Sequence, residues 1–339
     1  MIISEAQALN YRLVVLVALG ADDPDAQAYR DAILPDSNLG DRIDLRFGRG
    51  DELAAHLPEA EVVVCGNLSP EQVSAAPNLR WISYWSAGMD GKATPQIRER
   101  GLLLTNASGV HGANIAEHVL CFMLMFTRRI DVHFRSQLAG RWERGLPANK
   151  AGASELTGQT LGIAGLGRIG EALASRAKAF GMRVVAVKRD PSVRHGAAPI
   201  DGLYRLDEIP RLLAESDHVC IALPYTPETH RLFDAKMLSH CKANAYLYNI
   251  ARGKIVDEPA LIDALTSGGL AGAGLDVFET EPLPENSPLW KLPNVLITPH
   301  TSGITPYYYP RAASLFAENL KRYLRGDRLN NLYDPARGY

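Results

Sequence analysis

The sequence is poor in cysteine and has no excess of basic residues, and each shortage excludes a class of protein. Among the 339 residues are four cysteines, none of them in a CxxC pair: Cys65, Cys121, Cys220 and Cys241. All four lie in apolar segments, so we expect buried thiols in a reducing compartment and no disulfide framework. The 36 lysines and arginines are offset by 38 acidic residues, which gives a net charge of -2. This balance disfavours nucleic acid and anionic membranes as main partners.

Long apolar runs and metal-ligand patterns are also missing. The longest apolar run, Val119 to Phe126, is far shorter than the roughly 20 residues of a membrane-spanning helix. Residues 1–10 lack the basic and apolar regions of a secretory signal, so we expect a cytoplasmic protein without a membrane partner. No cluster of His, Cys and Asp has metal-ligand spacing, so we expect no metal. With 46% hydrophobic and 22% charged residues, the composition is that of a globular chain, long enough for two domains.

The most informative feature that the sequence does contain is a glycine-rich turn. The six residues follow an apolar run at 161–164 and open a helical stretch at 171–180: Gly165, Leu166, Gly167, Arg168, Ile169 and Gly170. Strand, glycine turn and helix in this order are typical of a dinucleotide-binding unit. The first glycine allows the tight turn, the second lets the backbone approach a pyrophosphate, and the third lets the helix pack close to the strand. The helix N-terminus then offers free N–H groups to the phosphates. We therefore predict that these six residues bind NAD or NADP.

The end of the next predicted strand, at 183–187, bears on the choice between NAD and NADP. NAD-binding sites place an acidic residue there, about 20 residues past the glycines, to hydrogen-bond the adenosine ribose. This chain has Lys188 and Arg189 instead, followed by Asp190. Two cations suit the 2′-phosphate of NADP, so we expect NADP to be preferred. The alternative is that both cations are solvated and that Asp190 binds the ribose of NAD.

Short apolar strands alternate with amphipathic helices along the whole chain, which predicts two α/β domains with parallel sheets. The strands are expected at 13–18, 43–47, 62–65, 81–85, 102–105, 161–164, 184–187, 219–223, 245–250, 274–277 and 295–297. A long helix is expected from about Ala113 to about Leu138, and a last helix from about Pro306 to Arg325. Because the first domain lacks a closing element, we expect this last helix to return to it. The fold class is then two doubly wound, Rossmann-like or flavodoxin-like domains with a cleft between them. Residues 1–109 and 304–339 would form the substrate domain, and residues 110–303 the NAD(P)-binding domain.

Three segments place polar residues just past predicted strands of the second domain, where ligands bind in doubly wound sheets. They are residues 248–253 (YNIARG), 274–282 (GLDVFETEP) and 298–303 (TPHTSG). Together with the glycine turn, these segments resemble the D-isomer-specific 2-hydroxyacid dehydrogenase family. The resemblance extends from about Ser86 to Arg325 and includes the stretches 88–90 (GMD), 116–118 (AEH) and 223–229 (LPYTPET).

The resemblance implies a catalytic set in which Arg252, Glu281 and His300 occupy the family's positions. Glu279 is a nearby acid, but the glutamate directly before proline is Glu281. The family's substrate loop corresponds to Gly88 and Met89, whose N–H groups would bind the substrate carboxylate together with Arg252 and His300. Further cofactor contacts are implied at Pro224, Thr229, Ile250, Ala251, Asp276, Ser302 and Gly303.

The chemistry of 2-keto acid reduction needs residues of these types. His300 can supply a proton, because imidazole titrates near neutral pH. Glu281 can hold one ring nitrogen and stabilise the charged imidazole. Arg252 can bind the carboxylate with a planar fork of donors and polarise the keto oxygen. These residues therefore predict a 2-keto acid reductase that prefers NADP, and the family resemblance implies glyoxylate or hydroxypyruvate as its substrate class. The resemblance also implies a homodimer joined around the long helix, which has apolar residues on more than one face, namely Ile115, Val119, Leu120, Phe122, Leu124 and Phe126.

Several alternatives remain open at this point. A nicotinamide-sensing binding protein, like the family's transcriptional corepressors, would share the motifs without significant turnover. A methyltransferase with a similar nucleotide fold would have no use for the catalytic set. The family's usual segment TPHIG is TPHTS here, and Trp85, His111 or Tyr307 to Tyr309 could shape the substrate pocket. His118 lies on the long helix, where we expect a core hydrogen bond or a subunit contact.

Overall fold

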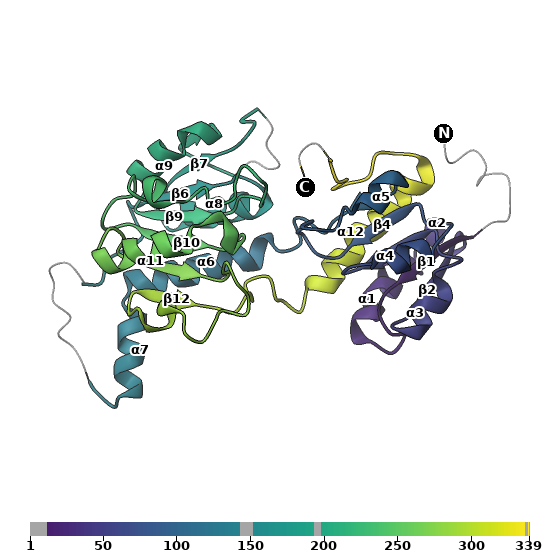
Figure 1. The fold of residues 1–339 in the computed structure, drawn as a ribbon, viewed down its shortest axis with the longest axis horizontal. Coiled ribbons are helices and arrows are strands. Elements are labelled where there is room, and N and C mark those ends of the chain that lie inside the picture. Colours follow the sequence, from purple (N-terminus) through teal and green to yellow (C-terminus); the bar gives the residue numbers. More distant parts are fainter. Residues whose placement is uncertain (1–11, 143–151, 193–197, 336–337, 339) are drawn as a thin grey trace. The chain divides into compact units, whose positions relative to one another are not determined.

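The computed structural model describes residues 12–142, 152–192, 198–335 and 338. The chain divides into two compact units (Figure 1). One unit consists of Met1–Val110 and Thr305–Tyr339, and the other of His111–Ile304. We call them the terminal unit and the central unit. The predicted pair of parallel α/β sheets is confirmed, since the terminal unit has a five-stranded and the central unit a seven-stranded parallel sheet.

The terminal unit has the strand order β2-β1-β3-β4-β5, which is the flavodoxin-like order of a doubly wound sheet. Its strands are β1 (Leu13–Val17), β2 (Ile43–Phe47), β3 (Val62–Cys65), β4 (Trp81–Tyr84) and β5 (Leu103–Thr105). Its helices are α1 (Pro24–Ile33), α2 (Ser37–Gly40), α3 (Asp51–His56), α4 (Pro70–Ser74), α5 (Pro95–Glu99) and α12 (Tyr308–Arg325). Helices α1 and α12 cover one face of the sheet, where Tyr29 and Phe316 pack against Trp81. Helices α3, α4 and α5 cover the other face.

The central unit has the strand order β12-β11-β10-β9-β6-β7-β8, so the order reverses between β6 and β9. Its strands are β6 (Thr160–Ala164), β7 (Arg183–Val187), β8 (Gly202–Tyr204), β9 (His218–Ile221), β10 (Tyr246–Asn249), β11 (Gly272–Leu275) and β12 (Val295–Ile297). Its α-helices are α6 (Gly112–Thr127), α7 (Ile130–Leu138), α8 (Arg168–Ala179), α9 (Ile209–Glu215), α10 (Ala235–Leu238) and α11 (Glu258–Ser267). Short 3-10 helices lie at η1 (Leu206–Glu208), η2 (Gly253–Ile255) and η3 (Pro288–Lys291). Ligands bind beside such a reversal, at the carboxyl ends of the strands.

Both faces of the central sheet are buried, which explains the nearly continuous apolar strands in the sequence. Helices α6 and α8 cover the face that Leu161 and Ile163 share with Tyr248. Helices α9 and α11 cover the opposite face, to which Val185 and Leu247 contribute. Figure 1 shows these helices around the strands of the central unit. This packing holds the strands in register and fixes the loops at their carboxyl ends.

The prediction of one helix from Ala113 to Leu138 is wrong, because the structure contains two helices. Helix α6 ends at Thr127, and Arg129 adopts a left-handed conformation with φ of 56° before α7 begins. The Thr127 hydroxyl donates to the Met123 carbonyl oxygen, 2.8 Å away, and the Arg128 side chain donates to the Ser154 carbonyl oxygen. Apolar periodicity continues through the break, so the pattern alone did not reveal it.

Two further predictions, one about this helix and one about the cysteines, need correction. The apolar residues of this helix are expected to exceed what one core can bury, but Ile115, Val119, Leu120, Phe122 and Phe126 are buried within the unit, and Leu124 is partly buried against the same cluster. The reason is that α6 packs against both the sheet and its neighbour α8, so more than one of its faces is covered. We also expected four buried thiols, but Cys121 is exposed and Cys241 is only partly buried.

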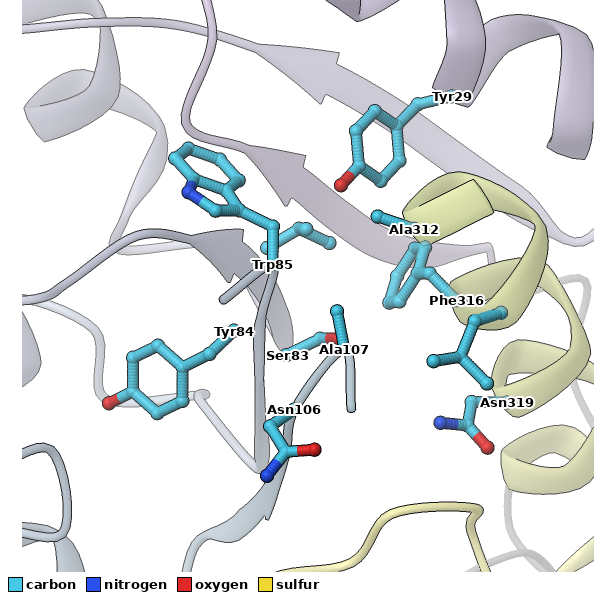
Figure 2. Close-up of a pocket in the computed structure, with 11 residues that line it drawn as sticks. Tyr29, Ser83, Tyr84, Trp85, Asn106, Ala107, Ala312, Phe316 and Asn319 are labelled. Atoms are coloured by element: carbon cyan, nitrogen blue, oxygen red, sulfur yellow. The ribbon is translucent and has the colours of Figure 1, made fainter. Parts of the chain in front are cut away.

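The terminal unit contains a small cavity between its sheet and α12. Figure 2 shows Tyr29, Ser83, Asn106 and Asn319 among the side chains that line it. Its volume is about 10 Å³, which is room for about one water molecule. A keto acid does not fit there, so this cavity is not a substrate site.

Candidate active site

The glycine turn has the geometry that a dinucleotide requires. Gly165 has φ of 110°, and a Cβ there would lie 2.6 Å from the Ala222 carbonyl oxygen. At Gly170 a Cβ would lie 2.5 Å from the Gly165 carbonyl oxygen, so the third glycine permits the close approach of helix and strand. At Gly167 a Cβ would have no neighbour within 4 Å. Gly167 is also the N-cap of α8 and has no side chain to satisfy the first N–H groups. The open backbone at Gly167 therefore fits a pyrophosphate. Leu166, Arg168 and Ile169 lie between the three glycines in the same turn, and their predicted cofactor contacts stay predictions.

Lys188, Arg189 and Asp190 follow β7 directly, at the same edge of the sheet. The Lys188 N–H donates to the Tyr204 carbonyl oxygen at 3.0 Å, and the side chain of Lys188 is half-buried. Asp190 Oδ1 accepts hydrogen bonds from both the N–H and the hydroxyl of Ser192, at 3.0 and 2.6 Å. The pKa of Glu228 is lowered, mainly by a hydrogen bond from Thr226 and to a smaller extent by the charge of Arg189. The charge of Arg189 therefore acts on the loop that follows β9.

Arg252 lies in a turn after β10 that two neighbours hold in shape. The Asn249 amide donates to the Arg252 carbonyl oxygen at 3.0 Å, and Asn249 Oδ1 accepts from the Ala251 N–H at 3.1 Å. A Cβ at Gly253 would lie 1.8 Å from the Phe278 carbonyl carbon, so the turn lies directly against the backbone that leads to Glu281. The sequence pattern included Asn249 and Gly253 but did not reveal these roles.

Glu281 and His300 are in direct contact. Glu281 Oε2 lies 2.8 Å from His300 Nδ1, and Glu281 Oε1 accepts from the Phe278 N–H at 3.0 Å. Both side chains remain partly exposed. His300 has a left-handed backbone with φ of 54°, and its N–H donates to the Asp276 carbonyl oxygen at 2.8 Å. A carboxylate acceptor at Nδ1 fixes the tautomer with a proton on Nδ1 and leaves Nε2 for proton exchange.

Glu279, the nearby acid, has a different partner. Its Oε1 atom lies 2.7 Å from Arg231 Nη2, and its N–H donates to the Glu258 carboxylate at 3.2 Å. Burial raises the pKa of Glu258. The structure therefore brings Glu281, and not Glu279, to His300.

The Asp276 carboxylate is buried and hydrogen-bonded within the protein. Its Oδ1 atom accepts from the Thr298 hydroxyl at 2.6 Å and from the Thr301 N–H at 2.8 Å. Its Oδ2 atom accepts from the Ser302 N–H at 3.1 Å. These contacts hold the segment that carries His300, a role that the sequence pattern did not indicate. Direct contacts of Asp276, Ser302 and Gly303 with the cofactor stay predictions.

The other implied cofactor residues lie in loops at the same edge. The buried Thr229 hydroxyl donates to the Pro224 carbonyl oxygen and accepts from the Thr226 N–H, both at 2.8 Å. Thr229 thus shapes the loop after β9 and presents Pro224. Ile250 and Ala251 lie between β10 and Arg252 and are largely buried. Their cofactor contacts also stay predictions.

Gly88 and Met89 belong to the terminal unit. They follow β4 in a loop in which the Ser86 hydroxyl donates to the Gly88 carbonyl oxygen at 3.2 Å. The start of this loop is held by Tyr308, whose hydroxyl donates to the Trp85 carbonyl oxygen at 2.6 Å. The predicted role of Gly88 and Met89 in carboxylate binding stays a prediction.

The strand order explains why the three residues predicted to be catalytic lie near one another in the central unit. Arg252 follows β10, Glu281 follows β11 and His300 follows β12, and these strands are neighbours. Their carboxyl ends share one edge, so a cation, a carboxylate and an imidazole are placed near one another. Within the described ranges, no group of three His, Cys, Asp or Glu residues is placed to hold a metal. The same ranges contain no helix long and apolar enough to cross a membrane.

Comparisons with known proteins agree with this geometry. A model of the NAD binding domain of D-isomer specific 2-hydroxyacid dehydrogenases matches residues 120–302. The chain is 36% identical over 280 residues to a glyoxylate reductase of Thermofilum pendens, with 82% of each chain covered. It is 37% identical over 297 residues to a D-3-phosphoglycerate dehydrogenase of Mycobacterium bovis; the match covers 85% of this chain and 54% of the relative, so the chain spans about half that relative's length.

A solved structure shows the same likeness in three dimensions. It is a D-isomer specific 2-hydroxyacid dehydrogenase from Xanthobacter autotrophicus in complex with NADPH and MES, and it is 32% identical. The TM-score is 0.79, and the superposition covers 97% of this chain and 100% of that one. The chain therefore belongs to the D-isomer specific 2-hydroxyacid dehydrogenase family and is an NAD(P)-dependent oxidoreductase that acts on the CH–OH group of 2-hydroxy acids.

Proposed function

We propose that the protein reduces a small 2-keto acid, such as glyoxylate or hydroxypyruvate, with NADPH as the preferred reductant. The observation that carries the proposal is the 2.8 Å contact between His300 Nδ1 and Glu281 Oε2. This pair lies at a sheet edge where Arg252 follows the neighbouring strand. The likeness to a glyoxylate reductase supports the substrate class.

The residues divide the reaction between them. The bound nicotinamide supplies the hydride that adds to the carbonyl carbon. Arg252 binds the substrate carboxylate with its planar guanidinium and draws charge from the keto oxygen. His300 keeps one proton on Nδ1, held by Glu281, and gives its Nε2 proton to the oxygen that becomes the hydroxyl. Glu281 stabilises the charged imidazole and orients it. In the reverse direction neutral His300 takes the proton back from the hydroxyl.

The preference for NADPH rests on the charges after β7. A 2′-phosphate carries about two negative charges and needs cationic partners. Lys188 and Arg189 offer two cations at the position of the ribose-binding acid. Asp190, the alternative ribose ligand, is already engaged by Ser192. The NADPH bound to the relative from Xanthobacter autotrophicus is consistent with this preference.

We also propose that the protein is a homodimer joined through α7. Ile130, Phe134 and Leu138 are four residues apart, which places them on one face of that helix. Their exposed fractions are 49%, 53% and 73%. Trp142, just beyond the helix, is 92% exposed. An apolar stripe of this kind is typical of a protein–protein contact. All four cysteines are free thiols, one of them exposed, which favours a cytoplasmic location.

The test of the proposed function is turnover of NADPH, followed by absorbance, with glyoxylate, hydroxypyruvate and 3-phosphohydroxypyruvate, the keto acid that corresponds to D-3-phosphoglycerate, in parallel. We expect reduction of a keto acid by the wild type and a loss of about 10²–10⁴-fold in kcat for His300→Ala. His240→Ala, which removes an exposed histidine of the same unit, is the matched control and should keep full activity. A wild type that binds NADPH but turns over no keto acid would instead be a nicotinamide-sensing protein.

A further inference from the structure

The segment that carries His300 is attached to the protein by a buried carboxylate. Asp276 accepts hydrogen bonds from residues on both sides of His300, namely the Thr298 hydroxyl and the Thr301 and Ser302 N–H groups. The carboxylate is fully buried, and a buried charge is tolerated only when donors surround it. The position of His300 therefore depends on the hydrogen bonds that these donors make with Asp276.

The Thr298 hydroxyl is the one side-chain donor in this set, and it has a second partner. Its oxygen lies 3.0 Å from His118 Nε2. A hydroxyl has a single proton, and Thr298 gives it to the acceptor-only carboxylate at 2.6 Å. The contact with His118 must then run from an Nε2–H of His118 to the Thr298 oxygen. A continuous path of donated protons leads from His118 through Thr298 to Asp276.

The environment of His118 is consistent with a neutral imidazole in this tautomer. The ring is half-buried, and burial lowers its pKa, with a smaller opposing effect of the Asp276 charge. Its ring packs edge-to-face on Phe122, at 4.7 Å between centroids and an interplanar angle of 84°. His118 is therefore suited to donate one hydrogen bond and is not arranged as a second proton source.

The backbone brings α6 close enough for this contact. A Cβ at Gly274, on β11, would lie 2.6 Å from the Phe122 ring, so the missing side chain lets α6 pack tightly over the strand that leads to Asp276. Two further residues at this end of α6, one and two turns before His118, bind the backbone just after His300. The Asn114 amide donates to the Ser302 carbonyl oxygen at 2.7 Å, and His111 Nδ1 lies 3.1 Å from the Gly303 carbonyl oxygen. Residues 111, 114 and 118 share one helix face, so this face of α6 borders the whole segment.

We propose that His118 is a positioning residue for proton transfer at His300, acting through Thr298 and Asp276. Its Nε2–H orients the Thr298 hydroxyl toward Asp276, and the oriented pair sets the backbone on both sides of His300. The inference rests on the proposed function in so far as His300 is the acid and base of the reaction. In this proposal α6 helps to position His300 and does not itself contact the substrate.

The test compares variants that keep or remove the donor. His118→Phe keeps a ring against Phe122 but removes the Nε2–H, and His118→Gln keeps an N–H donor of similar reach. We expect His118→Phe to lose about 10–100-fold in kcat, since a displacement near 1 Å of a reacting group has up to this effect. His118→Gln should restore most of the rate.

A second readout needs neither cofactor nor turnover. NMR titration of the His300 imidazole in the free protein reports the contact with Glu281. His118→Phe should move the titration midpoint of His300 toward that of Glu281→Gln, and His118→Gln should leave it at the wild-type value. This arm separates the two proposals, because a wild type without keto acid turnover would refute the function while the titration still decides the role of His118.

Controls distinguish positioning from general loss of stability. His218→Gln replaces another buried histidine of the central unit, at the amino end of β9 and so away from the carboxyl ends that carry the site, and it should keep the wild-type kcat. If His118→Phe does not fold, the same comparison is made with Thr298→Val, which removes the hydroxyl, and Thr298→Ser, which keeps it. Thr127→Val is then the control, because it removes a buried threonine hydroxyl on α6. Thr298→Val should lose activity and Thr298→Ser should keep it. Wild-type kcat and an unmoved His300 titration in folded His118→Phe or Thr298→Val would overturn the proposal.

Discussion

Replacement of each fingerprint glycine by alanine should separate cofactor binding from folding. At Gly167 the added methyl group meets no protein atom within 4 Å, so the change should lower the free energy of unfolding by at most about 1 kcal/mol, as expected at an N-cap. The same methyl group occupies the space through which a pyrophosphate would reach the backbone. The loss of one hydrogen bond to a charged group is worth about 1.5–3 kcal/mol, which raises the Kd for NADPH by roughly 10- to 150-fold.

Gly170→Ala should behave differently, because its methyl group would lie 2.5 Å from the Gly165 carbonyl oxygen. Helix α8 must then move away from β6, and overpacking of this kind lowers stability by about 1–3 kcal/mol. Gly20→Ala is the control, since a Cβ there also has no neighbour within 4 Å and the residue lies outside the fingerprint.

The assay combines urea unfolding with titration of NADPH by protein fluorescence. Gly167→Ala should unfold almost like the wild type and bind NADPH weakly. Gly170→Ala should be impaired in both measurements, and Gly20→Ala in neither. If Gly167→Ala bound NADPH with wild-type affinity, the cofactor would not approach the backbone at this glycine, and the pyrophosphate site would have to be placed elsewhere.

Four further predictions concern charge and assembly. Glu281→Gln should move the decline of keto-acid reduction to lower pH in kcat profiles, because the charged imidazole loses the carboxylate 2.8 Å from Nδ1; an unmoved profile would reject this role. Lys188→Asp combined with Arg189→Ala should reverse the order of KM for NADPH and NADH with little change in kcat, and a wild type that already prefers NADH would contradict the assignment. Burial lowers the pKa of His218 from 6.5 to about 4, so the unfolded chain binds a proton at this histidine more readily than the folded protein does. The free energy of unfolding should therefore be constant above pH 6.5 and fall by up to about 3 kcal/mol toward pH 4. Urea unfolding at several pH values should show this slope, and His218→Gln should flatten it. In light scattering we expect a dimer for the wild type and a monomer for Phe134→Glu, and a dimeric mass for this variant would exclude α7 from the contact.

The sequence alone was sufficient for the features that depend on neighbouring residues. Strands such as β2, β3, β7 and β12 have the predicted bounds, because apolar runs between turn residues are a local signal. The glycine fingerprint was equally clear, since each glycine answers a local demand of the backbone or of an adjacent strand. The positions of Arg252, Glu281 and His300 were implied by the resemblance of three strand-end segments to a known family.

The tertiary structure decided what depends on contacts between distant segments. The break at Arg129 could not be predicted from apolar periodicity, because the spacing of apolar residues is the same before and after it. The exposure of Cys121 depends on which side of α6 the sheet and α8 cover. The path from His118 through Thr298 to Asp276 joins residues 180 and 22 positions apart. Hydrogen bonds over such separations exist only once strand order and helix packing are set, and for this reason the support of His300 emerges from the fold and not from any one motif.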